Sequence, residues 1–544
     1  MSYAAAIDQL SAMTPELFTQ PGHTRRKFSL DEIGILLAAM GNPHHRFPYV
    51  LIAGTNGKGS TAATLASILT ASGLCAGLYT SPHLTRPNER IRVNSVEITD
   101  DAFAALYFRV NDCAQQLVLD QTLAQLPSFF ETLTAMAFLH FAEASIDIAV
   151  LEVGMGGRLD ATNIVDPILS IVTDISLDHT EWLGPTIAAI AREKAGILRS
   201  NGTLITLPQH PEANQVLGEI ATELGVRAIS AVPYMPQTAP LSRHSGDPNL
   251  AGFVTGHDFS RVAQAAKGNG ALAPGGSTYS VEVLNTQIEV ASPLHGAHQH
   301  RNIALAIAAA VELATHHALP ITAASIEQGI RTTHWPARLE VIATRPRQAC
   351  SDLDRSTPHT PACHPENPHA GGPASDGVGV VVSLSNSEGS APPQVAQWIL
   401  DVAHNPAGAW ALRAALRSLL DLDAPSAKPA TLIFGCLRDK PIAEMAQILF
   451  PIFDRVIFAP IHSPRATPMA DLLAAAASTG TPATAATSVA EAIELAESSA
   501  SAANESVRPA STAARTASRV VVAGSVYLVG EARALLLARA GVPA

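Results

Sequence analysis

The sequence predicts an α/β protein: an N-terminal P-loop-type ATPase domain on a mainly parallel sheet, then a smaller C-terminal α/β domain of Rossmann-like type. Short apolar runs alternate with helical patterns along most of the 544-residue chain, as expected of strand–helix–strand units. One such run, VLIA, leads into a glycine-spaced turn that carries Lys58, and a helical pattern follows up to Gly73. A content of 47% hydrophobic and 15% charged residues is typical of a globular chain.

The glycine-spaced turn, GTNGKGST, predicts a phosphate-binding loop. A turn between a strand and a helix N-terminus aims backbone N–H groups at phosphate, and Lys58 would reach the β- and γ-phosphates. The hydroxyl of Ser60 or Thr61 could ligate Mg²⁺. The match to GxxxxGK[ST] is imperfect, because Ile52 stands at the first glycine and Gly59 separates the lysine from the hydroxyl. An ordinary strand-to-helix turn is the alternative, and the rest of the chain decides between them.

The bulk properties exclude several classes of partner. A net charge of −12 predicts no general attraction to nucleic acid or to an anionic membrane. The five cysteines are scattered and form no disulfide framework or metal knuckle, which indicates a reducing compartment. The first residues lack a basic region followed by an apolar core, and no apolar run approaches the roughly 20 residues of a membrane span. We therefore expect a soluble, cytoplasmic protein, and we expect a monomer.

Two further apolar runs end in residues with reactive side chains. The run 146–153 ends at Glu152, and the run 168–175 is followed by Asp178 and His179. The carboxyl ends of parallel strands share one edge of the sheet, where ligands bind. Each residue alone could be a solvated loop residue. The coincidence of a phosphate loop, a carboxylate and a histidine on one edge predicts a metal site beside the phosphates.

Two helices carry residues for which a structural role is the simpler explanation. Ser128 and Glu131 form a capping box at the start of an amphipathic helix over 128–144. Lys194 stands in the last turn of another helix, where a lysine usually serves only the helix dipole.

The second half of the chain predicts a domain joint and two insertions. Pro336 interrupts what precedes it and a new strand follows, which indicates domains of residues 1–335 and 336–544. The segments 345–393 and 495–518 are of low complexity and predict mobile insertions. Between and after them, strand, polar turn and helix recur, so the second domain is also predicted to be α/β.

Nine stretches, taken in order, resemble the dihydrofolate synthase/folylpolyglutamate synthase family of the Mur ligase superfamily. They cover most of the chain outside the two low-complexity segments. LEVGMGGRLDATN and the pair DHTEWLG and AREKAGI are specific to the family, whereas GTNGKGS is shared across the superfamily. The stretches are AGTNGKGS, TSPHL with NERIRVN, SFFETLTAMAF, LEVGMGGRLDATNIVD, LDHTEWLGPTIAAIAREKAGI, HQHRNIALA, WPARLEV, LDVAHNPAGA and GSVYLVGEAR.

The resemblance implies an ATP-dependent acid–amino-acid ligase. It would join L-glutamate to dihydropteroate, and to the glutamate tail of tetrahydrofolate, through an acyl-phosphate intermediate. Folylpolyglutamate synthase activity alone, or another Mur-type amide ligation, is the alternative within the superfamily. A non-ligase P-loop nucleotide switch is the alternative from another class. No guanine-reading N-K-x-D motif is evident, and a switch would not need the second domain that bears DVAHNP.

The resemblance also implies the site residues. The ATP phosphates would be held by Gly54, Thr55, Asn56, Gly57, Lys58, Gly59 and Ser60, and the nucleotide would be contacted across the domain cleft by Asn302, Arg338, Asp401 and His404. Two Mg²⁺ ions would be bound, one by Ser81 and Glu152 and the other by His179 and a carbamylated Lys194. The pterin would face Ser128, Phe129, Phe130, Glu131, Leu159, Asp160 and Ala161, with a loose match at Thr14 to Leu17. The residues expected to act in catalysis are Lys58, His179, Lys194, Asp401 and His404.

The resemblance sets one requirement on Lys194, and the chain departs from the family pattern at two places. Carbamylation requires Lys194 as a neutral amine, so its ordinary pKa of about 10.4 must be lowered by burial or by nearby cations. The chain also departs from the family pattern at Ala337, which replaces the usual glycine before Arg338. Arg338 and Asp401 are much farther apart in sequence than in the family, which identifies 345–393 as an inserted hairpin extension.

Overall fold

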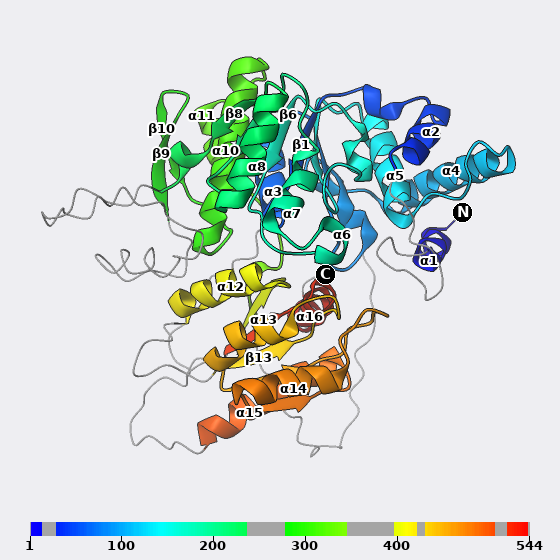
Figure 1. Ribbon diagram of the computed structural model, residues 1–544. Helices are drawn as coiled ribbons and strands as arrows, with labels where there is room; N and C mark the ends of the chain where they lie inside the picture. The colour runs from blue at the N-terminus through cyan, green and yellow to red at the C-terminus, as the bar shows by residue number, and fades with distance from the viewer. Residues whose placement is uncertain are drawn as a thin grey trace, which may run out of the picture.

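The computed structural model describes residues 2–13, 29–236, 278–344, 396–420, 430–505 and 519–541. These residues form two α/β units, drawn one above the other in Figure 1. The upper unit contains an eight-stranded sheet of order β4-β3-β2-β5-β1-β6-β7-β8 and a two-stranded hairpin, and the lower unit contains a six-stranded sheet of order β11-β12-β16-β13-β14-β15. The predicted fold class is confirmed.

Six strands of the first sheet are parallel, and the two antiparallel pairings are those of β3, with β2 on one side and with the edge strand β4 on the other. Strand β1 lies between β5 and β6, so the three strand ends that carry the predicted site residues are neighbours. All five residues of β1 are buried, as expected of a strand covered on both faces. The strands are β1 (Tyr49–Ala53), β2 (Ala76–Tyr79), β3 (Ile91–Val93), β4 (Val96–Glu97), β5 (Ile148–Glu152), β6 (Leu169–Val172), β7 (Thr203–Thr206) and β8 (Arg227–Ser230).

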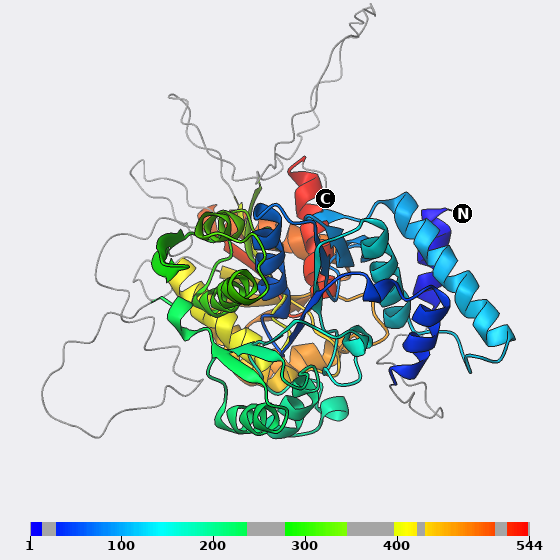
Figure 2. The same ribbon diagram turned by 90° about the horizontal axis from the view of Figure 1, so that it is seen from above.

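Helices cover both faces of this sheet, and each face has its own apolar core. Seen from above in Figure 2, the green helices α10 and α11 and the blue helices α1 and α4 lie on opposite sides. One core includes α1 (Tyr3–Ala12), α2 (Asp31–Ala39), α4 (Asp100–Leu119), α5 (Phe129–Glu143), α6 (Thr180–Leu183), α7 (Ile187–Ala195) and α8 (Pro211–Glu223). The other includes α3 (Lys58–Ala71), α10 (Ala297–His316), α11 (Ala323–Arg331) and the hairpin of β9 (Tyr279–Val283) and β10 (Thr286–Val290). Short 3-10 helices are η1 (Pro43–His45), η2 (Pro87–Arg90), η3 (Ala161–Ile164) and η4 (Val232–Tyr234).

The second sheet is parallel except for its edge strand β11, which pairs antiparallel with β12. Its strands are β11 (Arg338–Thr344), β12 (Ala396–Asp401), β13 (Ala430–Phe434), β14 (Arg455–Phe458), β15 (Ala483–Ala485) and β16 (Arg519–Ala523). One core contains α12 (Pro406–Leu419), α13 (Ile442–Leu449), η5 (Phe450–Ile452) and α14 (Met469–Thr479). The other contains α15 (Val489–Glu505) and α16 (Val526–Arg539).

Helix α15 overlaps one of the two low-complexity segments. It continues through Glu505, so the first residues of the segment 495–518 are helical. The alanine and glutamate residues there have high helix propensity, which low complexity does not cancel. The segment 345–393 and the stretch Thr14 to Leu17 lie outside the described residues. In the part of the chain that is described, no helix is long and apolar enough to cross a membrane.

Candidate active site

The glycine-spaced turn after β1 has the geometry of a phosphate loop. Helix α3 begins at Lys58, within the turn itself, so the loop residues lead directly into a helix N-terminus. Gly57 has a φ of 89°, and a Cβ there would lie 2.1 Å from Asn302 Oδ1. Only glycine fits this close approach. Lys58 Nζ donates to the carbonyl of Thr55 at 3.3 Å, so the lysine folds back over the loop.

The loop is fixed to the end of the neighbouring strand β6. The backbone N–H groups of Thr55 and Asn56 donate to the carbonyl of Asp174 at 2.8 and 3.2 Å. The Thr55 hydroxyl donates to the carbonyl of Ser176 at 3.1 Å. The Asp174 carboxylate accepts from Arg301 Nε on helix α10 at 2.9 Å. These contacts hold the loop in place before any nucleotide binds.

Glu152, at the end of β5, lies beside Ser81. It is 4% exposed, and its Oε2 accepts from the backbone N–H of Ser81 at 3.1 Å. Burial raises the pKa of Glu152, while the charges of Lys58 and Arg338 and the Ser81 hydrogen bond oppose the rise. A buried carboxylate next to a serine offers the hard oxygen ligands that Mg²⁺ prefers.

His179 follows β6 and precedes α6 in a left-handed backbone conformation, with a φ of 49°. Burial lowers its pKa to about 4, although the carboxylate of the adjacent Asp178 opposes this shift. The imidazole is therefore neutral at pH 7, which is the form that binds a metal ion.

Lys194, in the last turn of α7, reaches the phosphate loop. It is 4% exposed, and its Nζ donates to the carbonyl of Gly54 at 2.8 Å. Burial, reinforced by the charge of Lys58, lowers the pKa of Lys194 to about 7. The condition for a neutral amine is thus met. A role in the helix dipole alone does not explain why this lysine is buried.

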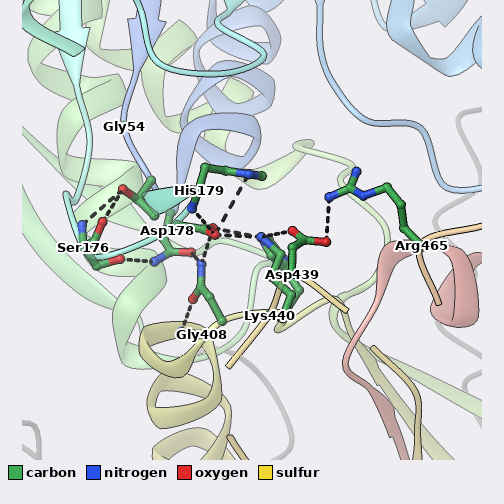
Figure 3. A network of polar contacts seen from close by, with 12 residues as sticks. Gly54, Ser176, Asp178, His179, Gly408, Asp439, Lys440 and Arg465 are labelled. Atoms are coloured by element: carbon green, nitrogen blue, oxygen red, sulfur yellow. Dashed lines mark hydrogen bonds and ion pairs between the residues drawn. The ribbon is translucent and has the colours of Figure 1, made fainter. Parts of the chain in front are cut away.

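The two units meet at Asp178, as Figure 3 shows. Its carboxylate accepts from Lys440 Nζ at 2.6 Å and from Asn405 Nδ2 at 3.0 Å, and it lies 3.6 Å from His404 Nε2. Asn405 Nδ2 also donates to Asn56 Oδ1 of the phosphate loop at 3.0 Å. The second unit thereby contacts both the phosphate loop and the residue next to His179.

Burial disfavours the charged form of Asp178, but its partners outweigh that effect. The hydrogen bond with His404 and the charges of Lys440 and His179 hold the pKa of Asp178 well below its ordinary range. Figure 3 shows the contacts continuing from Lys440 through Asp439 to Arg465, with Arg465 Nη2 donating to Asp439 Oδ1 at 2.7 Å. Sequence reasoning missed Lys440 and Asn405. Asn405 stands in LDVAHNPAGA, one of the stretches that carry the resemblance and imply Asp401 and His404, whereas Lys440 follows strand β13.

Arg338 and Asp401 lie opposite each other in the register of β11 and β12, although a long segment separates them in sequence. The Asp401 carboxylate accepts from the backbone N–H groups of Leu339 at 3.0 Å and Ala403 at 2.9 Å. Burial raises the pKa of Asp401, opposed by the charges of His298 and Arg338. In the first unit, Asn302 on α10 lies against Gly57 of the phosphate loop. The other three predicted nucleotide contacts, Arg338, Asp401 and His404, lie at or just after the paired ends of β11 and β12 in the second unit.

A pocket of about 150 Å³ lies beside this site. Six of the seven residues predicted to face the pterin line it, and Phe129 is the exception. Its wall also includes Trp182, Leu183 and Glu193. The predicted residues in the lining are Ser128, Phe130, Glu131, Leu159, Asp160 and Ala161.

The polar groups of the pocket wall are held by local structure. The predicted capping box is confirmed: the Ser128 N–H donates to Glu131 Oε2 at 2.7 Å, and the Glu131 N–H donates to Ser128 Oγ at 3.2 Å. Asp160 caps η3 and accepts from the backbone N–H groups of Thr162 at 3.0 Å and Met155 at 2.9 Å. These bonds fix both segments of the pocket wall.

Among the described residues, no three His, Cys, Asp or Glu side chains gather as a metal cluster. A metal ion at this edge would therefore depend on other oxygen donors, namely the Ser81 hydroxyl, phosphate oxygens or a modified lysine.

Comparison with known proteins gives two family-model matches, the Mur ligase middle domain over residues 52–231 and the Mur ligase glutamate ligase domain over 389–526. The chain is 31% identical over 437 residues to folylpolyglutamate synthase of Lacticaseibacillus casei, covering 80% of this chain and 82% of that one. It is 30% identical over 473 residues to dihydrofolate synthase/folylpolyglutamate synthase of Escherichia coli, covering 87% and 84%.

Solved structures give the same result. Mycobacterium tuberculosis folylpolyglutamate synthase complexed with ADP and AMPPCP aligns with a TM-score of 0.72 at 27% identity, covering 98% of this chain and 99% of that one. The E. coli FolC complex with DHPP and ADP aligns with a TM-score of 0.68 at 25% identity, covering 99% of each chain.

Proposed function

The chain belongs to the dihydrofolate synthase/folylpolyglutamate synthase family of Mur ligases and is an ATP-dependent ligase, and from that premise we propose its substrates and site chemistry. It joins L-glutamate to dihydropteroate and to the glutamate tail of tetrahydrofolate. The observation that carries this proposal is the position of two consecutive residues of α7. Glu193 lines the pocket, and Lys194 reaches Gly54 of the phosphate loop. A pterin in the pocket and an ATP on the loop would therefore be neighbours.

The chemistry explains why both must meet. A carboxylate is a poor electrophile, so one of its oxygens first attacks the γ-phosphorus of ATP. The bond to the β-phosphate oxygen breaks, and ADP leaves. The α-amine of glutamate then adds to the carbonyl carbon of the acyl phosphate, the carbon–oxygen bond to phosphate breaks, and phosphate leaves with the electron pair. The amine loses its protons to solvent. Phosphoryl transfer of this kind depends mostly on positioning and charge neutralisation.

The residues of this chain divide that work. Lys58 and the backbone N–H groups of the loop hold the phosphates. Arg338, Asp401 and His404 hold the nucleotide from the second unit, and Asn302 holds it from the first. Holding reactants in one geometry can supply about 7–11 kcal/mol of the barrier. A site between two units suits this purpose, because the phosphate-binding residues of the first unit and the nucleotide-binding residues of the second then contact the same ATP.

The donor set fits two Mg²⁺ ions. Ser81 and Glu152 suit the first, because Mg²⁺ is usually bound by one or two carboxylates together with phosphate oxygens. His179 and the carbamate of Lys194 suit the second, although imidazole is a less usual ligand for Mg²⁺. Bound Mg²⁺ would neutralise negative charge on the phosphate oxygens. The phosphate loop also places Ser60, at the start of α3, among the candidate ligands.

Carbamylation of Lys194 is supported by its surroundings. An amine must be neutral to add to carbon dioxide, and a pKa of about 7 leaves roughly half of Lys194 neutral at pH 7. The product would be a carboxylate close to Gly54 and the γ-phosphate position. A resonance from labelled carbon dioxide, present in the native protein and absent from Lys194→Ala, would test this modification without measuring activity.

We also propose that the domains divide at residue 335 and that the protein is a monomer with no nucleic-acid or membrane partner. The first strand of the second sheet begins at Arg338, which supports the division. Molar mass by light scattering tests the monomer, and a dimer would contradict it.

The experiment that tests the function measures ADP release with dihydropteroate or tetrahydrofolate, each with and without glutamate, and resolves the products by mass. We expect ADP only when a pterin carboxylate and glutamate are both present, with one glutamyl residue added per turnover. ATP turnover indifferent to both substrates would contradict the proposal. Product from tetrahydrofolate alone would restrict the activity to polyglutamylation.

A further inference from the structure

Arg90 is a buried cation with no role in the site so far. It is the last residue of η2 and is 7% exposed. Its Nε donates to His83 Nδ1 at 2.9 Å, which fixes the plane of the guanidinium. The carbon of the guanidinium lies 5.2 Å from the centroid of the Phe129 ring, at the start of α5. Two neighbours from different segments therefore hold one orientation.

The position of Arg90 connects the two halves of the site. Among the predicted pterin-facing residues that the structure describes, Phe129 alone does not line the pocket, and the next two residues of α5 do line it. The backbone carbonyl of Arg90 accepts from the Thr80 N–H at 3.0 Å, and the residue after Thr80 is Ser81. Glu152 in turn accepts from the Ser81 N–H. Arg90 thus contacts Phe129, next to the pocket wall, with its side chain, and it pairs through its backbone with the segment that leads to Glu152.

The carboxylate of a bound pterin substrate would lie near Arg90. If the pterin occupies the pocket, its carboxylate has to reach the γ-phosphate beside Glu152 and Lys58. A guanidinium presents its donors in a planar fork that matches the two oxygens of a carboxylate. Such a cation would hold the carboxylate for attack on phosphorus and would oppose the negative charge that later develops on the carbonyl oxygen.

We propose that Arg90 binds the pterin carboxylate that becomes phosphorylated, with His83 and Phe129 as its positioning residues. This inference rests on the proposed function. It assigns the carboxylate end of the acceptor substrate to a residue that is separate from the phosphate loop and from the pocket lining.

The test compares two ligands and two variants. Binding of dihydropteroate and of its carboxamide, which keeps the shape but loses the charge, is measured by calorimetry with ADP present. The variants are Arg90→Met and the control Arg92→Met. Arg92 is also 7% exposed, but it lies over the ring of Trp335 at 5.5 Å and pairs with Glu97 at 3.2 Å. Both variants remove one buried arginine, so a general loss of stability affects both.

We expect the native protein to prefer the carboxylate over the carboxamide, and Arg90→Met to lose about 10–100-fold of that preference, as for a charged hydrogen bond. Arg92→Met should keep it. Arg90→Lys keeps the charge without the fork and should retain part of the preference, which provides a second measurement if Arg90→Met does not fold. In turnover, Arg90→Lys should lower kcat while the affinity for ADP stays unchanged.

The outcomes separate this inference from the proposed function. A native protein that binds neither ligand would contradict the proposed function itself. A native protein that ligates dihydropteroate, together with an Arg90→Met variant that keeps the full carboxylate preference, would contradict the role of Arg90 alone. Equal loss of preference in the Arg92 control would mean that the effect is structural, and it would also overturn the inference.

Discussion

Replacing Lys440 by methionine should loosen the contact between the two units. Lys440 Nζ lies 2.6 Å from Asp178 Oδ1, and the two side chains are 5% and 9% exposed. Removing one partner of a buried ion pair costs about 3–5 kcal/mol, because the other charge is left buried. Asp178 would still accept from Asn405 Nδ2 at 3.0 Å and from the His179 N–H at 2.9 Å. We therefore expect a cost near the lower end, about 3 kcal/mol.

Native-state hydrogen exchange measures this cost without requiring two-state unfolding of a protein with two units. The Gly408 amide is a suitable probe, because it donates to Asn405 Oδ1 at 2.8 Å beside the interface. The free energy of opening at this amide should fall in Lys440→Met. Adding Asp178→Asn to that variant should lower it little further. The control is Arg331→Met, which removes the exposed Arg331–Glu327 pair of α11 at 2.6 Å. We expect that control to cost at most about 0.5 kcal/mol.

The pH dependence of the opening free energy tests separately whether the charged form of Asp178 stabilises the contact between the two units. The pKa of Asp178 is held below its ordinary value, so the folded state keeps this carboxylate charged more readily than the unfolded state does. Its contribution is fully present above pH of about 4 and is lost as the pH falls further, towards the lowered pKa. The native protein and Lys440→Met should therefore differ in the free energy of opening at Gly408 by a constant amount from pH 5 to 8. Equal opening energies for Lys440→Met and the native protein would refute the reasoning.

Three further substitutions test the site and its backbone. Lys194→Ala should lose most turnover and recover part of it with added short carboxylates, and full activity without them would exclude the carbamate. Gly57→Ala should abolish ATP turnover, because its Cβ would lie 2.1 Å from Asn302 Oδ1 at a φ of +89°; an unchanged KM for ATP would contradict that geometry. Ala337→Gly should raise the free energy of unfolding by about 0.5–1 kcal/mol, because Ala337 has a φ of 57° that costs an L-residue about 1–2 kcal/mol. A lower melting temperature would show that this strain is absent.

Local rules predicted the elements well where one segment determines its own structure. The apolar run VLIA before the glycine-spaced turn lies within β1, and Ser128 and Glu131 form the reciprocal capping bonds that their spacing indicates. The shared strand edge also placed Glu152 at the end of β5 and His179 after β6, the two strands that pair with β1. Periodicity and capping act within a few residues, so they can be read from sequence.

The remainder depends on burial and on contacts between distant segments. Lys440 and Asp178 are 262 positions apart, and a lysine after a strand ordinarily indicates a solvated loop. Lys194 has the sequence context of a dipole-stabilising residue, and only its burial against Gly54 indicates another role. Arg90 likewise stands in a polar stretch that resembles a solvated loop, yet it is buried. Desolvation of a charge is a property of the packed molecule, so neither residue spacing nor composition reveals it.

The most direct test of the central claim follows one oxygen atom. Dihydropteroate carrying a heavy oxygen isotope at both oxygens of its carboxylate is incubated with ATP and glutamate, and the released phosphate is analysed by mass spectrometry. An acyl-phosphate intermediate transfers one carboxylate oxygen to phosphate, so we expect one labelled oxygen in each phosphate released. Phosphate without the label, formed together with the amide product, would contradict the account.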